Sequence, residues 1–216
     1  EDYLMELIDR SLVVVFTKKS NGGIKTCCIH DLLRDLCLRK AREENFLRQI
    51  YWYEQVSSIS SSIPISNKQC HLGIHSDYVR LKPRALQVRS FLSFGSFLPF
   101  SSYLSNLPRQ HISFVCQTFK LLRVLTILVD HHSFFPKEIE QLIYLRYLEF
   151  RACEVDLQSP ISKLWNLETL IINRSWRRLI LPNDIWKMVK LRHLYTSEFI
   201  KPPRVPDDGY PFILSN

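Results

Sequence analysis

Leucines recur at a regular spacing across the second half of the chain. The pattern Leu-x-x-Leu-x-apolar occurs three times between Leu122 and Ile172, and a fourth copy ends in Thr196. The first leucines of successive copies are 23, 22 and 24 residues apart. The positions are Leu122, Leu125, Ile127; Leu145, Leu148, Phe150; Leu167, Leu170, Ile172; and Leu191, Leu194, Thr196.

A second apolar register precedes the last three copies. Its positions are Ile139, Leu142, Leu145; Ile161, Leu164, Leu167; and Ile185, Met188, Leu191. A period of about 20–29 residues with these spacings is typical of leucine-rich repeats, which alternate one short strand with a looser or 3₁₀-like return segment. Because one repeat cannot bury its own leucines, we expect the repeats to stack into a curved solenoid, a fold that usually binds other proteins.

The first 45 residues have a different pattern. Residues 12–16 are apolar and mostly β-branched, which predicts a strand buried on both faces. The turn signal at residues 20–23 then leads to a second strand at 24–29. Two apolar stripes at helical spacing flank this hairpin: Leu4, Leu7, Ile8, Leu12 and Ile29, Leu32, Leu33, Leu36, Cys37. Asp31 is the expected N-cap of the second helix, residues 43–45 mark its end, and a hairpin packed on such helices is a winged-helix arrangement.

The sequence therefore predicts an α+β chain, with a winged-helix unit followed by a leucine-rich-repeat solenoid of short parallel strands. We place the winged-helix domain at 1–56, a serine-rich linker at 57–69, degenerate capping repeats at 70–120 and regular repeats at 121–216. Two strands are expected in the capping region, around Leu72 and Ile74 and around Val88, Phe91 and Leu92. Pro136, Pro160 and Pro182 fall in the return segments, where a missing N–H group costs little.

The net charge of +8 comes mainly from the middle of the chain. Residues 61–120 carry seven basic side chains and one acidic side chain, whereas residues 1–60 carry nine of each. This basic segment is either a solvated surface or a docking patch for an acidic protein face.

The six cysteines form no Cys-x-x-Cys pair, which favours reduced thiols in a cytosolic protein over a disulfide framework. Cys27, Cys28 and His30 fit no standard zinc spacing, so we expect no metal site. No apolar run approaches the roughly 18–20 residues of a membrane span. The chain starts without Met and stops within the leucine pattern, and we expect both of its ends to be cuts in a longer protein.

Two stretches near the N-terminus resemble one protein family. They are Tyr3-Leu4-Met5-Glu6-Leu7-Ile8-Asp9-Arg10-Ser11-Leu12 and Ile29-His30-Asp31-Leu32-Leu33-Arg34-Asp35-Leu36. The second is similar to the Met-His-Asp motif in the winged-helix part of the NB-ARC module of plant immune receptors. The repeats are also similar to those of this family, notably Leu145-Arg146-Tyr147-Leu148 and Leu181-Pro182-Asn183-Asp184-Ile185-Trp186. The resemblance is closest to coiled-coil receptors of the late-blight-resistance kind.

The resemblance implies a nucleotide-controlled switch in plant innate immunity. In the family the motif histidine lies against the β-phosphate of ADP, a role that would fall on His30, with Asp31 capping the helix that supports it. Ile29 stands where the family has Met, and we expect packing to be kept. Because the sequence contains no Gly-x-x-x-x-Gly-Lys-Ser/Thr loop, ADP or ATP would bind the full-length receptor and not this segment alone.

The exposed positions between the strand leucines are the expected protein interface. They are Arg123, Arg146, Tyr147, Glu149, Arg151, Glu168, Asn173, Arg192, His193 and Tyr195. The resemblance implies two kinds of partner: the receptor's own nucleotide-binding domain, and a pathogen effector or guarded host protein. It implies a cytoplasmic location, with a peripheral-membrane or nuclear location in the active state, and a defence output such as the hypersensitive response.

Three other functions fit the sequence less well. DNA binding is disfavoured because the second helix region carries four basic and four acidic side chains, which gives no phosphate-seeking face. A leucine-rich adaptor or scaffold without switch activity would explain residues 120–216 but not the Ile29-His30-Asp31 unit. An enzyme is disfavoured because no nucleophile–base pair can be assigned, and any ATP hydrolysis would belong to an upstream domain.

Overall fold

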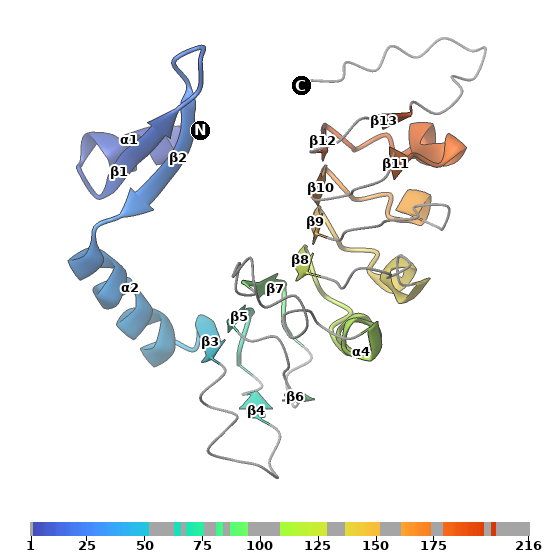
Figure 1. The fold of residues 1–216 in the computed structure, drawn as a ribbon. Coiled ribbons are helices and arrows are strands. Elements are labelled where there is room, and N and C mark those ends of the chain that lie inside the picture. Colours follow the sequence, from blue (N-terminus) through green and yellow to red (C-terminus); the bar gives the residue numbers. More distant parts are fainter. Residues whose placement is uncertain are drawn as a thin grey trace, which may run out of the picture. The chain divides into compact units, whose positions relative to one another are not determined.

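The computed structural model describes residues 2–51, 63–65, 68–75, 81–83, 87–94, 109–128, 137–151, 161–173, 179–196 and 200–201. The chain divides into two compact units, Glu1–Leu47 and Arg48–Asn216. Pro136 and Pro160 lie outside the described residues. Each unit is described by itself (Figure 1).

The first unit consists of helix α1 (Asp2–Asp9), a two-stranded antiparallel hairpin and helix α2 (Asp31–Glu43). The hairpin strands are β1 (Val13–Lys18) and β2 (Ile24–Ile29). Gly22 has φ +83°, a conformation that glycine adopts without steric cost, and its N–H donates to the Lys19 carbonyl at 3.0 Å. The predicted order of helix, hairpin and helix is confirmed.

The prediction that the first strand is buried on both faces is wrong. Val13 is the buried residue of β1, whereas Val14 and Phe16 are 48% and 77% exposed. Phe16 lies at a register shift between the Val15–Cys27 and Thr17–Thr26 pairs, so it is opposite no residue of β2. Within residues 2–47 no second layer covers these side chains, and an apolar strand sequence cannot report whether such a layer exists.

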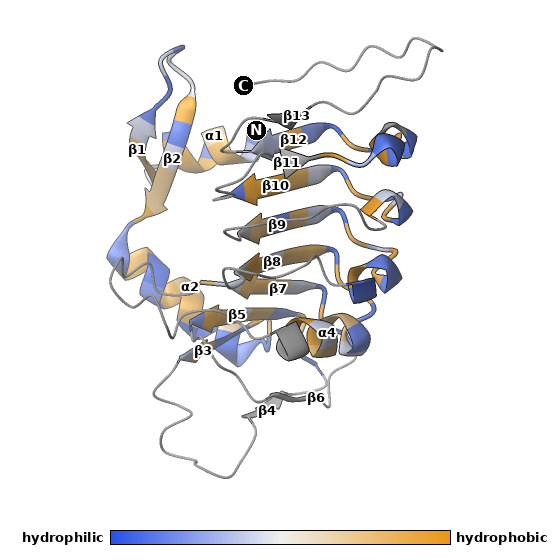
Figure 2. Ribbon diagram, turned by 45° about the vertical axis from the view of Figure 1, so that its right-hand side comes forward, coloured by the Kyte–Doolittle hydropathy of each residue, from blue (hydrophilic) through white to orange (hydrophobic). Residues whose placement is uncertain are grey.

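The second unit is built on a seven-stranded sheet with the order β12-β10-β9-β8-β7-β5-β3. Neighbouring strands from β5 to β12 are parallel. Figure 2 shows these strands side by side, each with the same direction as the next. The strands are β3 (Leu47–Tyr51), β5 (His71–His75), β7 (Ser90–Ser93), β8 (Val124–Leu128), β9 (Tyr147–Arg151), β10 (Thr169–Asn173) and β12 (His193–Thr196).

The leucine pattern sets the register of this sheet. Leu125, Leu148, Leu170 and Leu194 are paired in sequence across β8, β9, β10 and β12, and Leu72 and Phe91 continue the same row on β5 and β7. Ile127, Phe150 and Ile172 form the adjacent row. Apart from Leu194 these side chains are at most 1% exposed. The prediction that each copy of the pattern supplies one short strand is confirmed, and so are the two strands expected upstream.

The return segments contain 3₁₀ helices, as predicted: η1 (Lys137–Gln141), η2 (Ile161–Lys163) and η3 (Asn183–Lys187). The second apolar register lies in and just after these helices, and all of its residues are buried in the same core as the strand leucines. The core therefore lies between the sheet and the row of 3₁₀ helices (Figure 2). Pro182 precedes η3 with φ −63°, which a proline ring adopts without strain.

Polar side chains connect successive turns along the outside of the core. Asn166 donates to the Ile143 carbonyl at 2.7 Å, and Lys190 donates to Asn166 Oδ1 at 2.6 Å. Similar links join Lys120 to Gln141, Lys163 to Glu140 and Ser162 to Asp184. Each link spans 21 to 24 residues, which is one period of the pattern.

Several elements were not predicted. Helix α4 (Arg109–Thr118) precedes β8, and its apolar residues Ile112, Val115 and Cys116, together with Phe119, have the spacing i, i+3, i+4, i+7. That signal was present in the sequence and identifies the helix. The short parallel pairs β4 (Ile63–Ile65) with β6 (Leu81–Pro83) and β11 (Leu179–Ile180) with β13 (Ile200–Lys201) carry too few residues for a pattern to show.

Candidate functional site

His30 lies between β2 and α2, where the chain turns from strand to helix. Its backbone has φ −58° and ψ 140°, and it is the N-cap of α2. The His30 side chain accepts a hydrogen bond at Nδ1 from the Leu32 N–H group, at 3.4 Å. A ring nitrogen that accepts carries no proton, so in the neutral ring the proton is on Nε2. The exposed imidazole thus uses one nitrogen for the helix and leaves an N–H donor on the other side.

The prediction that Asp31 caps this helix is wrong. Asp31 is the first residue of α2, and His30 occupies the capping position instead. The backbone enters the helix one residue earlier than the preference for Asp at the N-cap suggests. The Asp31 carboxylate still lies in the first turn, where negative charge interacts favourably with the helix dipole.

The face of the sheet turned away from the core presents the residues that alternate with the buried leucines. We call this the open face: Val124, Thr126, Tyr147, Glu149, Thr169, Ile171, His193 and Tyr195, which are paired in two rows across β8, β9, β10 and β12. Most of the predicted interface residues are accessible. The exposed ones are Arg123, Arg146, Arg192, His193 and Tyr195, and the partly buried ones are Tyr147, Glu168 and Asn173. The Arg151 side chain lies outside the described atoms.

Glu149 was expected to be exposed, and that prediction is wrong. Its residue exposure is only 9%, and its carboxylate accepts hydrogen bonds from Tyr147 Oη at 3.2 Å and from Asn173 Nδ2 at 3.1 Å. A carboxylate in the middle of a sheet face is recessed in this way because its neighbours on adjacent strands lie only about 4.8 Å away.

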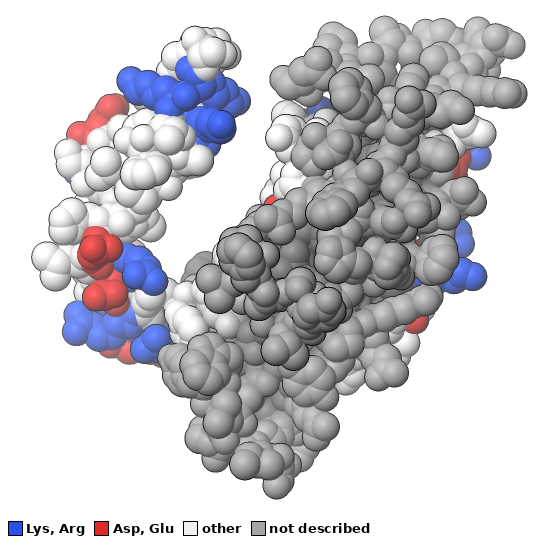
Figure 3. Space-filling view, viewed as in Figure 1, with Lys and Arg blue, Asp and Glu red and all other residues white. Residues whose placement is uncertain are grey.

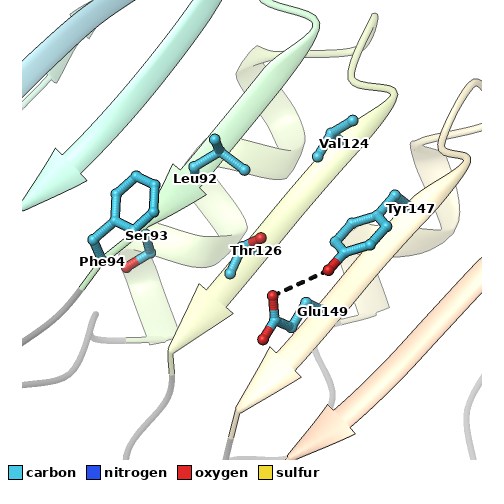
Figure 4. Close-up of a pocket in the computed structure, with 7 residues that line it drawn as sticks. All are labelled: Leu92, Ser93, Phe94, Val124, Thr126, Tyr147 and Glu149. Carbon is cyan, nitrogen blue, oxygen red and sulfur yellow. Dashed lines mark hydrogen bonds between the residues drawn. The ribbon is translucent and has the colours of Figure 1, made fainter. Parts of the chain in front are cut away.

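A pocket of about 310 Å³ lies on the open face between β7, β8 and β9. Figure 4 shows its lining, in which Leu92, Val124, Thr126, Tyr147 and Glu149 project from three adjacent strands. Ser93 and Phe94, at the end of β7, complete it. Sequence reasoning included Tyr147 and Glu149 but missed the others, although Leu92, Val124 and Thr126 occupy the alternating positions that the strand pattern assigns to this face.

Aromatic rings stack next to this pocket, and Phe94 belongs to both. The His75 ring lies between Tyr51 and Phe94, with ring centroids 4.6 Å and 4.8 Å away. On the same strand, burial and the nearby Arg89 charge lower the pKa of His71 below its usual value. Both effects favour the neutral imidazole of His71 at neutral pH.

Charges of both signs are mixed on α2. The helix carries acidic residues near both ends and basic residues between them, and the space-filling view shows red and blue atoms together there (Figure 3). The basic residues are Arg34, Arg39, Lys40 and Arg42. Lys40 pairs with Glu43 at 2.8 Å. The helix surface therefore has no uniform sign of charge.

The chain aligns along most of its length with a group of resistance proteins from Solanum demissum. It is 39% identical over 207 residues to putative late blight resistance protein homologue R1B-12, and 38% identical over 209 residues to homologue R1B-8. It is 35% identical over 208 residues to late blight resistance protein R1-A. Each alignment covers 92% of this chain. No protein-family model matches the chain.

Over 92% of its length the chain is homologous to a segment of late blight resistance proteins. It spans about 16% of the length of these relatives, so the family relationship applies to one segment of a much longer protein type. The aligned part of the chain contains both His30 and the sheet with the open face. Among the helices in the described part of the chain, none has both the length and the hydrophobicity of a membrane span.

Proposed function

We propose that this segment is part of a plant intracellular immune receptor that acts in disease resistance. The observation that carries the proposal is the alignment of 92% of the chain with late blight resistance proteins. In this proposal the first unit is the winged-helix end of an NB-ARC module, and the parallel sheet with its 3₁₀ helices is the start of a leucine-rich-repeat solenoid. The periodic leucines that are paired across β8, β9, β10 and β12 support the second assignment.

The proposed role of His30 is to report the nucleotide state. With Nδ1 directed to the Leu32 N–H group, the Nε2–H group is available to donate to a phosphate oxygen of ADP. The N-terminus of α2 adds unsatisfied N–H groups and the positive end of a helix dipole, which both favour a phosphate. The Asp31 carboxylate in the same turn would repel the phosphate, and the His30 donor would offset part of that repulsion.

We expect this segment to bind nucleotide poorly by itself, since its sequence holds no phosphate-binding glycine loop. ADP and ATP would bind the intact receptor, and any hydrolysis would occur outside this segment. The repeats would contact the receptor's own nucleotide-binding domain in the resting state and a pathogen effector or guarded host protein on activation. The proposed location is the cytoplasm.

The test is a cell-death assay in leaves with His30 variants of the intact receptor. His30→Ala removes both the helix cap and the Nε2–H donor, whereas His30→Asn keeps a good N-cap residue and removes only the imidazole. If His30 holds ADP, both variants will trigger cell death without a pathogen, and the matched control Arg39→Ala on the exposed face of α2 will stay silent. A silent His30→Asn variant, expressed at the wild-type level, would show that His30 serves only as a cap.

A further inference from the structure

A row of mostly arginine residues lies at the edge of the sheet where the chain enters the strands. Arg89, Arg123, Arg146, Glu168 and Arg192 each occupy a position just before a strand, from β7 to β12. Their backbones are joined in sequence, because the N–H group of each residue after Arg89 donates to the carbonyl of the residue before it in the row, at 2.7–2.8 Å. We call these five residues the arginine row, whose net charge is four positive minus one negative, or +3.

The charges of the arginine row are poorly compensated within the described part of the chain. The ion pair in the row joins Arg146 Nε to Glu168 Oε1 at 3.9 Å, with side chains 60% and 42% exposed. Arg89 and Arg123 are exposed, and the strands that follow them, β7 and β8, are neighbours whose backbones lie about 4.8 Å apart along the sheet. Like charges on adjacent strands repel each other, and an anionic partner would relieve that repulsion.

The pocket of the open face lies beside the middle of this row. Arg123 and Arg146 directly precede Val124 and Tyr147, two of the residues that line the pocket. Leu92 and Phe94 make the opposite wall, and Phe94 is 50% exposed. A volume of about 310 Å³ accommodates one large apolar side chain with room for its neighbouring backbone.

Glu149 fixes the direction in which an anionic ligand can lie. Its carboxylate lines the pocket two residues along β9 from Tyr147, and so lies away from the arginine row. A negatively charged group would be attracted to Arg123 and Arg146 and repelled at the Glu149 side. The pocket therefore combines an apolar lining with one carboxylate, and Arg123 and Arg146 directly precede two of its lining residues at the start of β8 and β9.

We propose that this part of the open face binds an acidic polypeptide segment that carries one large apolar side chain. The apolar side chain fills the pocket, and the acidic residues beside it contact Arg123 and Arg146. The inference rests on the proposed role of the sheet as a protein-binding surface and adds the chemistry of the partner. A polypeptide suits the site better than a nucleic acid because the pocket offers apolar carbon where a sugar or phosphate would have to lie.

The test uses the 216-residue chain and three fluorescein-labelled peptides, each with a central Leu, Phe or Trp between three Asp or Glu residues on either side. Binding is measured by fluorescence anisotropy at low salt. We expect at least one peptide to bind with a Kd below about 100 µM, which corresponds to a binding free energy near −5.5 kcal/mol. The same peptide with Lys in place of the acidic residues, or with a central Ser, should bind at least tenfold more weakly.

Two changes to the chain should weaken binding at least tenfold: Thr126→Trp, which fills the pocket, and Arg123→Glu combined with Arg146→Glu. The matched control Arg39→Glu makes the same kind of charge change on α2 and should alter the Kd less than twofold. Circular dichroism and thermal unfolding verify that each variant is folded. The proposal fails if no peptide binds with a Kd below about 1 mM, or if folded variants bind unchanged. It also fails if a single-stranded oligonucleotide binds more tightly and ignores Thr126→Trp.

The peptide assay and the cell-death assay can fail separately. Loss of peptide binding would remove the partner chemistry assigned to the open face and leave the role of His30 untouched. A silent His30→Asn variant would remove the nucleotide role and leave the peptide site untouched.

Discussion

At the scale of single residues, His30 and Asp31 show that backbone geometry, more than position in a motif, determines which side chain caps a helix. The sequence motif identifies His30 and Asp31 as a pair but does not say which residue caps α2. Aspartate is the better N-cap by preference, yet the backbone of His30 has the extended ψ of 140° that a cap needs, and its imidazole accepts from the Leu32 N–H group. The start of a helix depends on one ψ angle, which a residue pattern does not define.

The thiols provide a test at this scale. Cys116 is buried in the core, and burial, with a smaller effect from Glu138, raises its pKa from 9.0 to about 12. Cys27, Cys28 and Cys37 are exposed. Iodoacetamide at about pH 8, followed by mass spectrometry, should modify these three within minutes and leave Cys116 unmodified, because the thiolate is the reactive form.

Unfolding the chain in urea should make Cys116 react like the others. The raised pKa also makes the stability of the fold depend on pH. Because the folded state holds the Cys116 proton more tightly, the contribution of this thiol to folding stability is present below pH 9.0 and is lost as the pH rises toward about 12. Rapid modification of Cys116 in the folded chain would contradict its placement in the core.

At the scale of elements, the period of the leucines predicts the positions of the strands well. It predicts poorly which of the other strand residues are exposed to solvent. The copies of Leu-x-x-Leu place β8, β9, β10 and β12 within a residue or two, because a buried leucine has few alternatives to the core. The exposure of β1 and the burial of Glu149 could not be predicted, since both depend on which neighbours lie across the sheet. Helix α4 had its own periodic signal, in Ile112, Val115, Cys116 and Phe119.

Two leucines that differ in burial test the role of the strand leucines. Leu148 is 0% exposed and paired with Leu125 and Leu170, whereas Leu121 is 41% exposed. Leu148→Ala should lower the free energy of unfolding by about 2–5 kcal/mol through the lost apolar contacts and the cavity left behind. Leu121→Ala should change it by less than about 1 kcal/mol. Urea unfolding followed by circular dichroism measures both, and equal effects would contradict the sheet register.

At the scale of the whole molecule, the sequence predicts both units but not the exposure of the apolar side chains in the first unit. Helix, hairpin, helix and the periodic strands were all predictable from apolar spacing. The first unit has Val13 as its buried apolar side chain, and Tyr3, Phe16 and Leu32 are exposed at 85%, 77% and 78%. The second unit buries a continuous core from Ile50 to Leu191. Stability in the second unit comes from the stacking of turns, each of which covers the next.

We propose that His30 helps to hold ADP in the resting receptor. The most direct measurement is the nucleotide content of the purified intact receptor, determined by chromatography after denaturation, for the wild type, His30→Asn and Arg39→Ala. We predict nearly one ADP per molecule in the wild type and in Arg39→Ala, and a loss of at least tenfold in His30→Asn, because the cap is kept and only the imidazole donor is removed. ADP retained at the wild-type level in His30→Asn would show that His30 does not hold the nucleotide.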